Sequence, residues 1–148
     1  QGYGEYVPID LSSMPNVYIG FRRSMSEGTE VLHNNLRARY NIGEPAVLAA
    51  MKEWAELTER FRDALATGDQ AAMFALINRN FDLRRSLVPI EPGNIEMVTL
   101  ARSVGASAKF TGSGGAIIGT YADDAMFDRL SAVLAPADIE VIRPKIVG

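Results

Sequence analysis

A glycine-rich stretch between Gly105 and Gly119 carries the most distinctive chemistry in the sequence. It reads Gly-Ala-Ser-Ala-Lys-Phe-Thr-Gly-Ser-Gly-Gly-Ala-Ile-Ile-Gly. Alternating and apolar residues on either side of Gly112–Gly115 predict two strands joined by a tight turn. Because glycine lacks a Cβ atom, the backbone N–H groups of such a turn can approach an anion closely. The stretch therefore fits either an anion-binding loop or an ordinary hairpin turn.

Two common phosphate-binding motifs do not fit this turn. A dinucleotide-binding fingerprint requires a third glycine where a helix begins, but Ile117 stands there in a strand-like run. A P-loop requires Gly-Lys-Ser/Thr after its glycines, whereas Lys109 precedes them. Neither motif is present.

Basic and amide side chains on two predicted helices form a second set of candidates. His33 and Arg37 are four residues apart, so they share one helix face. Asn80 interrupts an apolar stripe, where an amide needs a hydrogen-bond partner or borders a site. Arg84 and Arg85 lie one turn further on. These side chains either face solvent and the negative end of the helix dipole or contact a ligand, and spacing leaves both open.

The elements that must position these residues follow from the periodicity of apolar residues. Four strands are predicted, over Val17–Arg22, Ser107–Thr111, Ala116–Tyr121 and Ile139–Arg143. Five helices are predicted: one carrying Leu32, Leu36 and Tyr40, one from Pro45 to Thr67-Gly68, one capped by Asp69 and ended before Pro89, one from Asn94 to Gly105, and one capped by Asp123 or Asp124 and ended at Pro136. Together they predict an α+β fold, a four-stranded antiparallel sheet with helices packed on one face.

Two helices have apolar stripes that predict their buried faces. The long helix carries Val47, Met51, Trp54, Thr58, Phe61 and Leu65, and the next one carries Met73, Leu76, Asn80, Leu83 and Leu87. We expect Trp54 to be buried. The length of 148 residues suits one domain, 1–148, with a hydrophobic core of its own.

Composition excludes several classes of function. A net charge of −3 argues against nucleic acid or an anionic membrane as partner, because both require a basic face. No apolar run is long enough to span a bilayer, and the first residues do not resemble a signal peptide. Without cysteine there is no disulfide, thiolate metal site or thiol nucleophile. We expect a cytoplasmic protein without a metal site, whose oligomeric state the sequence does not define.

The run Ala108–Gly115, with Gly105-Ala106 upstream, resembles the third conserved motif of the GHMP kinase superfamily. This superfamily includes galactokinase and the homoserine, mevalonate and phosphomevalonate kinases. Within it the chain most resembles the glucuronokinase-like sugar kinases, through Tyr6–Asp10, His33–Tyr40 and Asn80–Arg85. The resemblance extends over nearly the whole chain, and it implies the ferredoxin-like C-terminal domain of such a kinase.

This resemblance implies an ATP-dependent kinase that phosphorylates a sugar hydroxyl, with the 1-OH of glucuronate as the narrowest expectation. The ATP phosphate loop and the catalytic Asp and Lys lie in the family's N-terminal domain, and nothing in this sequence matches them. The chain is therefore expected to be incomplete, to contain no catalytic residue, and to be inactive alone. ATP and Mg²⁺ are expected in the intact kinase, with neither bound by this chain alone.

The resemblance also implies roles for the candidate residues. The loop near the transferred phosphate is expected to comprise Lys109, Thr111, Gly112, Ser113, Gly114 and Gly115. The sugar is expected to contact His33, Arg37, Asn80, Arg84 and Arg85. An arginine is suited to a uronate because its guanidinium can donate hydrogen bonds to both carboxylate oxygens. Three alternatives stay open: a heptose-phosphate kinase domain, a non-catalytic ligand-binding or regulatory module, and a structural subunit.

Overall fold

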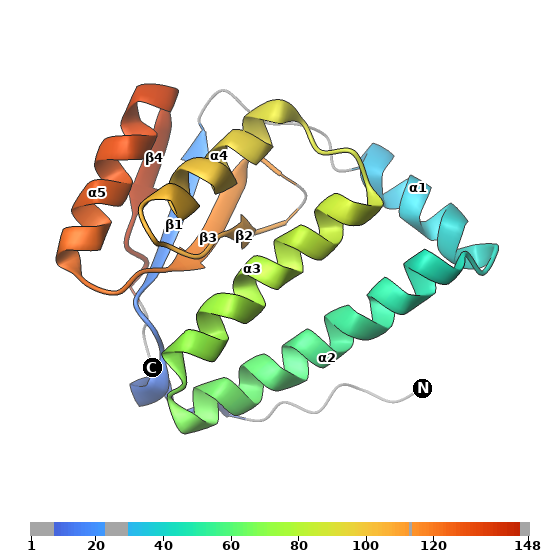
Figure 1. Cartoon of the computed structure of the whole chain (residues 1–148), viewed down its shortest axis with the longest axis horizontal. Helices are drawn as coiled ribbons and strands as arrows, with labels where there is room; N and C mark the ends of the chain where they lie inside the picture. Colours follow the sequence, from blue (N-terminus) through green and yellow to red (C-terminus); the bar gives the residue numbers. More distant parts are fainter. Residues whose placement is uncertain (1–7, 23–29, 113, 146–148) are drawn as a thin grey trace.

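The fold places four strands and five α-helices around a single sheet (Figure 1). It is given by a computed structural model that describes residues 8–22, 30–112 and 114–145, without the side chains of residues 11 and 30–34. The elements, in chain order, are the 3₁₀ helix η1 (Leu11–Ser13), β1 (Val17–Arg22), α1 (Glu30–Asn41), α2 (Pro45–Thr67), α3 (Gln70–Leu87), α4 (Pro92–Ser103), β2 (Lys109–Phe110), β3 (Ala116–Thr120), α5 (Asp124–Leu134), the 3₁₀ helix η2 (Ala135–Ala137) and β4 (Ile139–Ile142).

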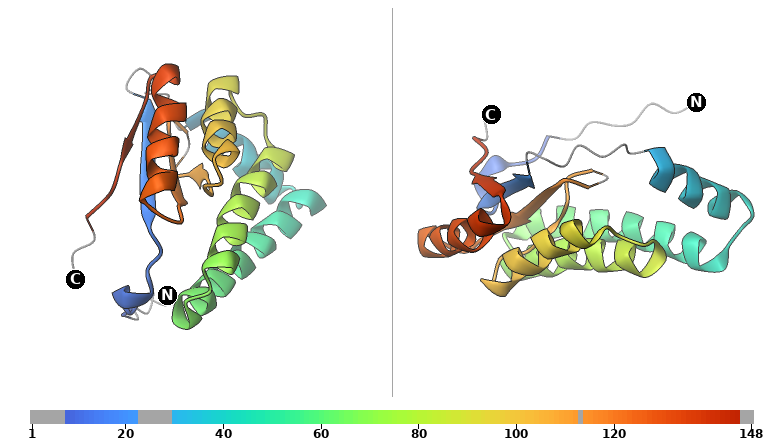
Figure 2. Two further views of the ribbon diagram at one scale, coloured as in Figure 1. Left: turned by 60° about the vertical axis from the view of Figure 1, so that its left-hand side comes forward. Right: turned by 90° about the horizontal axis from the view of Figure 1, so that it is seen from above.

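The four strands form one antiparallel sheet in the order β2-β3-β1-β4. In the central strand β1, Ile19 lies opposite Ile118 of β3 on one side and Ile142 of β4 on the other. Helices α3, α4 and α5 pack on the same face of the sheet, and α2 lies outside α3 (Figure 2). The predicted α+β fold with helices on one face is confirmed.

Most helix boundaries follow local signals in the sequence. The side chain of Asp69 accepts a hydrogen bond from the backbone nitrogen of Ala72, and Asp123 caps α5 in the same way through Met126. Helix α2 starts at Pro45 and ends at Gly68, which has a left-handed φ of 69°. Helix α4 begins at Pro92, two residues earlier than expected, because proline suits the first helical turn.

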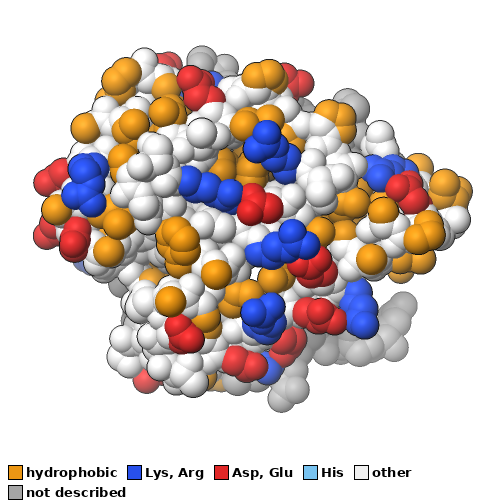
Figure 3. All heavy atoms as spheres, in the orientation of Figure 1, with side chains coloured by type: hydrophobic (Ala, Val, Ile, Leu, Met, Phe, Trp, Pro, Cys, Tyr) orange, Lys and Arg blue, Asp and Glu red, His pale blue; other side chains and the backbone are white. Residues whose placement is uncertain are grey.

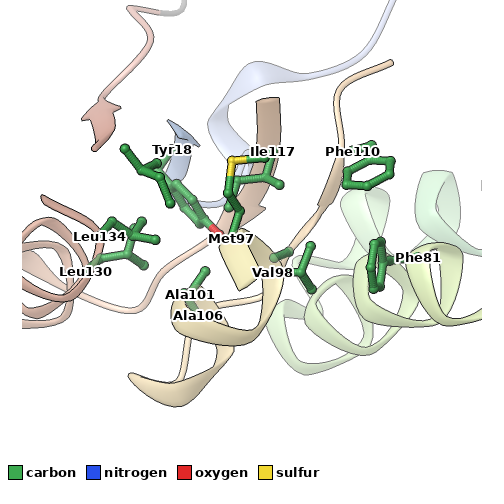
Figure 4. Close-up of a cluster of buried hydrophobic side chains, with 12 residues drawn as sticks. Tyr18, Phe81, Met97, Val98, Ala101, Ala106, Phe110, Ile117, Leu130 and Leu134 are labelled. Carbon is green, nitrogen blue, oxygen red and sulfur yellow. The ribbon is translucent and has the colours of Figure 1, made fainter. Parts of the chain in front are cut away.

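The hydrophobic core has two parts that share helix α3. Between the sheet and α3, α4 and α5, the larger buried side chains are Tyr18, Phe81, Met97, Ile117, Leu130 and Leu134 (Figure 4). Between α2 and α3 the buried residues are Ala50, Leu57, Ala64, Leu65, Met73, Leu76 and Leu83. Helix α3 therefore uses two faces and fixes the α2–α3 pair against the sheet.

The buried face of α2 differs from the predicted stripe. Ala50, Leu57 and Ala64 face α3, whereas Met51 is 38% exposed. These three residues recur every seven positions along α2, and this row lies against α3 in place of the predicted stripe. Trp54, expected to be buried, is only partly buried, and its indole nitrogen donates to the carbonyl of Asn80 at 3.4 Å.

Strand β2 is shorter than the predicted Ser107–Thr111. The carbonyl of Ser107 accepts from the buried hydroxyl of Tyr18 (2.8 Å), and the N–H of Thr120 donates to the Ser107 hydroxyl (2.7 Å). Hydrogen bonds with side chains thus take the place of the backbone bond between the N–H of Thr120 and the carbonyl of Ser107. Desolvation raises the pKa of Tyr18, so the phenol stays a donor.

Candidate functional site

The glycine turn, residues 112–115, joins β2 to β3, as predicted. The N–H of Thr111 donates to the carbonyl of Ala116 and closes the hairpin (3.2 Å). Gly115 has a φ of 76°, which requires glycine. A Cβ atom on Gly114 would lie 2.9 Å from Nδ2 of Asn94. Two of the glycines therefore have structural reasons to be there, and Ser113 lies outside the described residues.

Three other elements hold this turn in place. Oδ1 of Asn94, in α4, accepts from the N–H of Gly115 at 2.8 Å. Nη1 of Arg84, in α3, donates to the carbonyl of Gly112 at 2.7 Å. In β1, the N–H of Arg22 donates to the carbonyl of Gly115 at 3.2 Å. Since the N–H of Gly115 is bonded internally, an anion at this turn has to be bound by other groups.

Two cations lie at the base of the turn. The guanidinium carbon of Arg84 is 5.4 Å from the centre of the Phe110 ring, and Nζ of Lys109 donates to the carbonyl of Phe110 at 3.1 Å. Burial lowers the pKa of both side chains, and the charge of Arg84 lowers the pKa of Lys109 further. Among the described residues, neither cation contacts a carboxylate. A bound anion would offset the free-energy cost of holding these two positive charges partly buried and close together.

Two other arginines, Arg79 of α3 and Arg102 of α4, are paired with carboxylates, in contrast to Arg84. Arg79 contacts Glu53, and Arg102 contacts Asp82 at 2.7 Å. Figure 3 shows blue and red side chains interspersed over this face of the molecule. Other described cations without a carboxylate partner, such as Arg37 and Arg85, are exposed, so the distinguishing feature of Arg84 and Lys109 is partial burial without such a partner.

A cavity of about 550 Å³ lies beside Lys109, between α2, α3 and the sheet. Most of its lining is apolar and includes Leu57, Phe61, Leu76 and Ile118. Asn80, Lys109 and Thr111 also line it, so the structure brings three predicted site residues from α3 and the hairpin to one cavity.

Of the remaining predicted residues, those that the structure describes do not line this cavity. Arg84 contacts the turn instead, and Arg85 is exposed on the last turn of α3. Arg37 is exposed on α1, and the side chain of His33 lies outside the described part of the chain. Helix α1 is held by Arg39, which donates to Glu44 at 2.6 and 2.7 Å and to the carbonyl of Leu87 at 2.6 Å.

Three polar residues that bond to the hairpin or to the segment before it were not singled out from the sequence. The pattern at Asn94 predicts only the start of a helix, yet this residue is 5% exposed and its side chain bonds to the turn. Asn78 accepts from the N–H of Ala108 at 3.0 Å, and Arg102 donates to the carbonyl of Ala108 at 3.2 Å. Asn94 lies on one helix face with Met97, Val98 and Ala101, so an amide within an apolar stripe was the available signal.

The described part of the chain has neither a cluster of metal ligands nor a membrane-spanning helix. No group of three or more His, Asp or Glu side chains there lies close enough together to hold a metal ion. In the same residues, no helix is both long and apolar enough to cross a membrane.

Comparisons with known proteins give two close sequence relatives. The chain is 42% identical to probable glucuronokinase 2 of Arabidopsis thaliana and 40% identical to glucuronokinase 1 of the same plant, each over 120 residues. Each match covers 79% of this chain but only 32% and 33% of the respective relative, so the chain spans about a third of their length. No protein-family profile matches the chain.

Solved structures with the same fold include kinases. L. major mevalonate kinase in complex with R-mevalonate has a TM-score of 0.77 at 19% identity, covering 90% of this chain and 44% of that one. Phosphomevalonate kinase of Streptococcus pneumoniae has a TM-score of 0.67 at 17% identity, covering 86% and 39%. At these identities the likeness concerns the fold. The chain thus resembles the glucuronokinases in sequence over about a third of their length, and it shares its fold with part of mevalonate and phosphomevalonate kinases.

Proposed function

We propose that this chain is the C-terminal domain of an ATP-dependent kinase that phosphorylates a sugar, with the 1-OH of glucuronate as acceptor. The observation that carries the proposal is the pair Lys109 and Arg84. Both cations are partly desolvated at a glycine turn, and neither has a carboxylate partner among the described residues. The identity of 40–42% to glucuronokinases supports the class of acceptor.

In this proposal the hairpin faces the transferred phosphate. Phosphoryl transfer depends mostly on positioning and on stabilising charge on the phosphate oxygens. Lys109 supplies a positive charge at the cavity, and Thr111 supplies a hydroxyl. The turn of Gly112, Ser113, Gly114 and Gly115 would let a phosphate come close to the backbone at Gly112, where no side chain is in the way, while Gly114 leaves room for Asn94.

The sugar would lie along the same side of α3. Asn80 lines the cavity, and Arg84 uses only one of its guanidinium nitrogens for the turn, so the others remain for a carboxylate. Arg85 is one position further, on the exposed side. His33 and Arg37 of α1 complete the proposed set of sugar-binding residues.

The chain is one part of the proposed active site. The side chains around the turn suit phosphate oxygens, but the described residues include no carboxylate cluster suited to Mg²⁺. The groups that bind Mg·ATP and activate the sugar hydroxyl would come from an N-terminal domain outside residues 1–148. We therefore expect no ATP or Mg²⁺ site on this chain alone, and no turnover by it.

Kinase assays on two proteins test this proposal. One is the chain alone, and the other is the chain joined to the remaining part of a kinase polypeptide, which Arabidopsis glucuronokinase 1 can supply; we call the second the intact kinase. The intact kinase should phosphorylate glucuronate from ATP, and the chain alone should not.

Turnover by the chain alone would refute the proposed division of the active site. A joined protein that is folded and binds ATP, yet phosphorylates no sugar, would refute the assignment as a sugar kinase. Circular dichroism and thermal melting of both proteins establish that each is folded.

A further inference from the structure

The amide of Asn94 is buried where α4 meets the glycine turn. Its side chain is 5% exposed, and Oδ1 accepts from the N–H of Gly115 at 2.8 Å. A buried amide costs stability unless it is hydrogen-bonded, and an apolar residue would fit the stripe of α4 without this cost. Packing of α4 therefore does not explain an amide at this position, whereas its hydrogen bond to the turn does.

Backbone pairing gives the turn little support of its own. Strand β2 has two residues, and its ladder to β3 pairs only Lys109 with Ile118 and Phe110 with Ile117. Beyond these pairs and the bond from the N–H of Thr111 to the carbonyl of Ala116, the turn is held from outside by Arg84, Arg22 and Asn94. Among these contacts, Asn94 provides the side-chain acceptor for an N–H of the turn.

The fit between Asn94 and the turn is tight. A Cβ atom on Gly114 would lie 2.9 Å from Nδ2 of Asn94, which is closer than real Cβ atoms approach their neighbours. Gly115 itself has a left-handed φ of 76°. The bond from Asn94 and the close contact at Gly114 together fix the orientation of the Gly114–Gly115 peptide.

We infer that Asn94 is a positioning residue for phosphoryl transfer, which holds the Gly114–Gly115 peptide in the orientation that the phosphate requires. This inference rests on the proposed function. Asn94 does not touch the substrate in this account, because Oδ1 is occupied by the N–H of Gly115. It acts through the turn, because its bond to the N–H of Gly115 fixes the direction in which that peptide points.

An amide suits this task better than the alternatives. Leucine has a similar shape but no acceptor, so it would leave the N–H of Gly115 unpaired. Aspartate keeps the acceptor but adds a negative charge beside a site for an anion. Asn94→Leu therefore removes the anchor, whereas Asn94→Asp keeps the anchor and weakens binding of the phosphate donor.

A matched control is available at the other end of the sheet. Asn16 precedes β1, and its exposed amide donates to the carbonyl of Ala122 at 3.0 Å. This end is far along the β1–β3 ladder from the turn, since Val17 pairs with Thr120 and Phe21 with Ala116. Asn16→Ala thus removes an amide-to-backbone bond without touching the turn.

The first test is hydrogen exchange of the Gly115 amide in the 148-residue chain, which requires no turnover. Asn94→Leu should speed this exchange at least about tenfold, because the N–H loses its acceptor. Asn94→Asp and Asn16→Ala should leave it close to wild type. Unchanged exchange in Asn94→Leu would overturn the anchor, whatever the outcome for the proposed function.

The second test is steady-state kinetics of the intact kinase. Asn94→Leu should lower kcat by about ten- to a hundredfold with little change in KM for the sugar, since a misplaced group costs rate rather than sugar binding. Asn94→Asp should recover most of kcat at saturating ATP but show a raised KM for ATP. An unchanged kcat in Asn94→Leu, with wild type active, would contradict the positioning role. An inactive wild type would instead refute the proposed function.

Discussion

The guanidinium of Arg84 and the carbonyl of Gly112 are joined by a hydrogen bond of 2.7 Å. This bond connects α3, which carries the proposed sugar-binding residues, to the turn that is proposed to face the phosphate. Arg84 also lies over the ring of Phe110, and burial lowers its pKa. One side chain thus links the two halves of the proposed site, and its removal should affect both.

Arginine substitutions test which side chain binds the carboxylate of a uronate. An arginine–carboxylate pair contributes about 1.5–3 kcal/mol, so Arg84→Ala in the intact kinase should raise KM for glucuronate about ten- to a hundredfold. We expect a smaller rise for Arg85→Ala, because its side chain is exposed. With glucose, KM should change little, whereas kcat of Arg84→Ala should fall for both sugars because the turn loses an anchor.

Steady-state kinetics with glucuronate and glucose give this comparison. Arg129 of α5 is exposed and serves as a control for loss of a surface arginine. Equal losses of kcat/KM on the two sugars in Arg84→Ala and Arg85→Ala would mean that neither arginine binds the carboxylate.

The charge state of Lys109 provides a test that needs no catalysis. Desolvation and then the charge of Arg84 lower its pKa from the ordinary value of 10.5. The folded state disfavours the charged amine, so the free energy of unfolding should rise with pH from the pKa of folded Lys109 to that of an unfolded lysine. Inorganic phosphate should raise the pKa of Lys109, since a nearby anion favours the charged form.

The chain has three lysines, so NMR of ¹³C-methylated amines can follow each one, with Lys109→Arg assigning the signal. Arg84→Gln should move the pKa of Lys109 upward by removing the repulsion, while burial still holds it below 10.5. A pKa at or above the ordinary value, or one insensitive to Arg84→Gln, would contradict the electrostatics described for the site.

Glycine substitutions distinguish the contribution of the turn to stability from the contribution of the sheet. A Cβ atom on Gly119 would lie 1.7 Å from the carbonyl oxygen of Ser107, which is backbone and cannot move away. At Gly114 the obstacle is the side chain of Asn94, which can rotate. Gly119→Ala should therefore lower the stability by about 3 kcal/mol or more, or prevent folding, and Gly114→Ala should cost about 1–2 kcal/mol.

Urea unfolding of the chain measures both effects. In the intact kinase, Gly114→Val should lower kcat while most molecules stay folded, because the new side chain displaces Asn94 and so disturbs the turn that is proposed to face the phosphate. If Gly114→Val lost stability but kept the kcat of wild type, the turn would be an ordinary hairpin turn.

The order of elements was predictable because each helix carries its own start and stop signals. Asp69, Asp123, Pro45 and Gly68 act within one helical turn, so a local reading of the sequence finds them. Strand β2 was predicted too long, since its shortening depends on the hydroxyl of Tyr18, which is 89 residues from Ser107 in sequence. Burial of Trp54 was overestimated because the row of α2 that is buried against α3 is Ala50, Leu57 and Ala64.

The candidate site was predictable in part for a similar reason. Asn80, Lys109 and Thr111 stand out by local pattern, and the fold brings them to one cavity. The roles of Asn94 and Asn78 depend on backbone groups of Gly115 and Ala108, 21 and 30 residues away. A single sequence does not reveal such pairs, because the amide carries no sign of which backbone group it will meet.

Phosphorylation of glucuronate by the intact kinase tests the central proposal most directly. Transfer of the γ-phosphoryl group from ATP is measured for glucuronate and for glucose as the neutral analogue. Recognition of the carboxylate by one arginine predicts a kcat/KM for glucuronate at least about tenfold above that for glucose. Transfer to glucose equal to or above that to glucuronate, by a folded protein that binds ATP, would contradict the assignment of this chain to a uronate kinase.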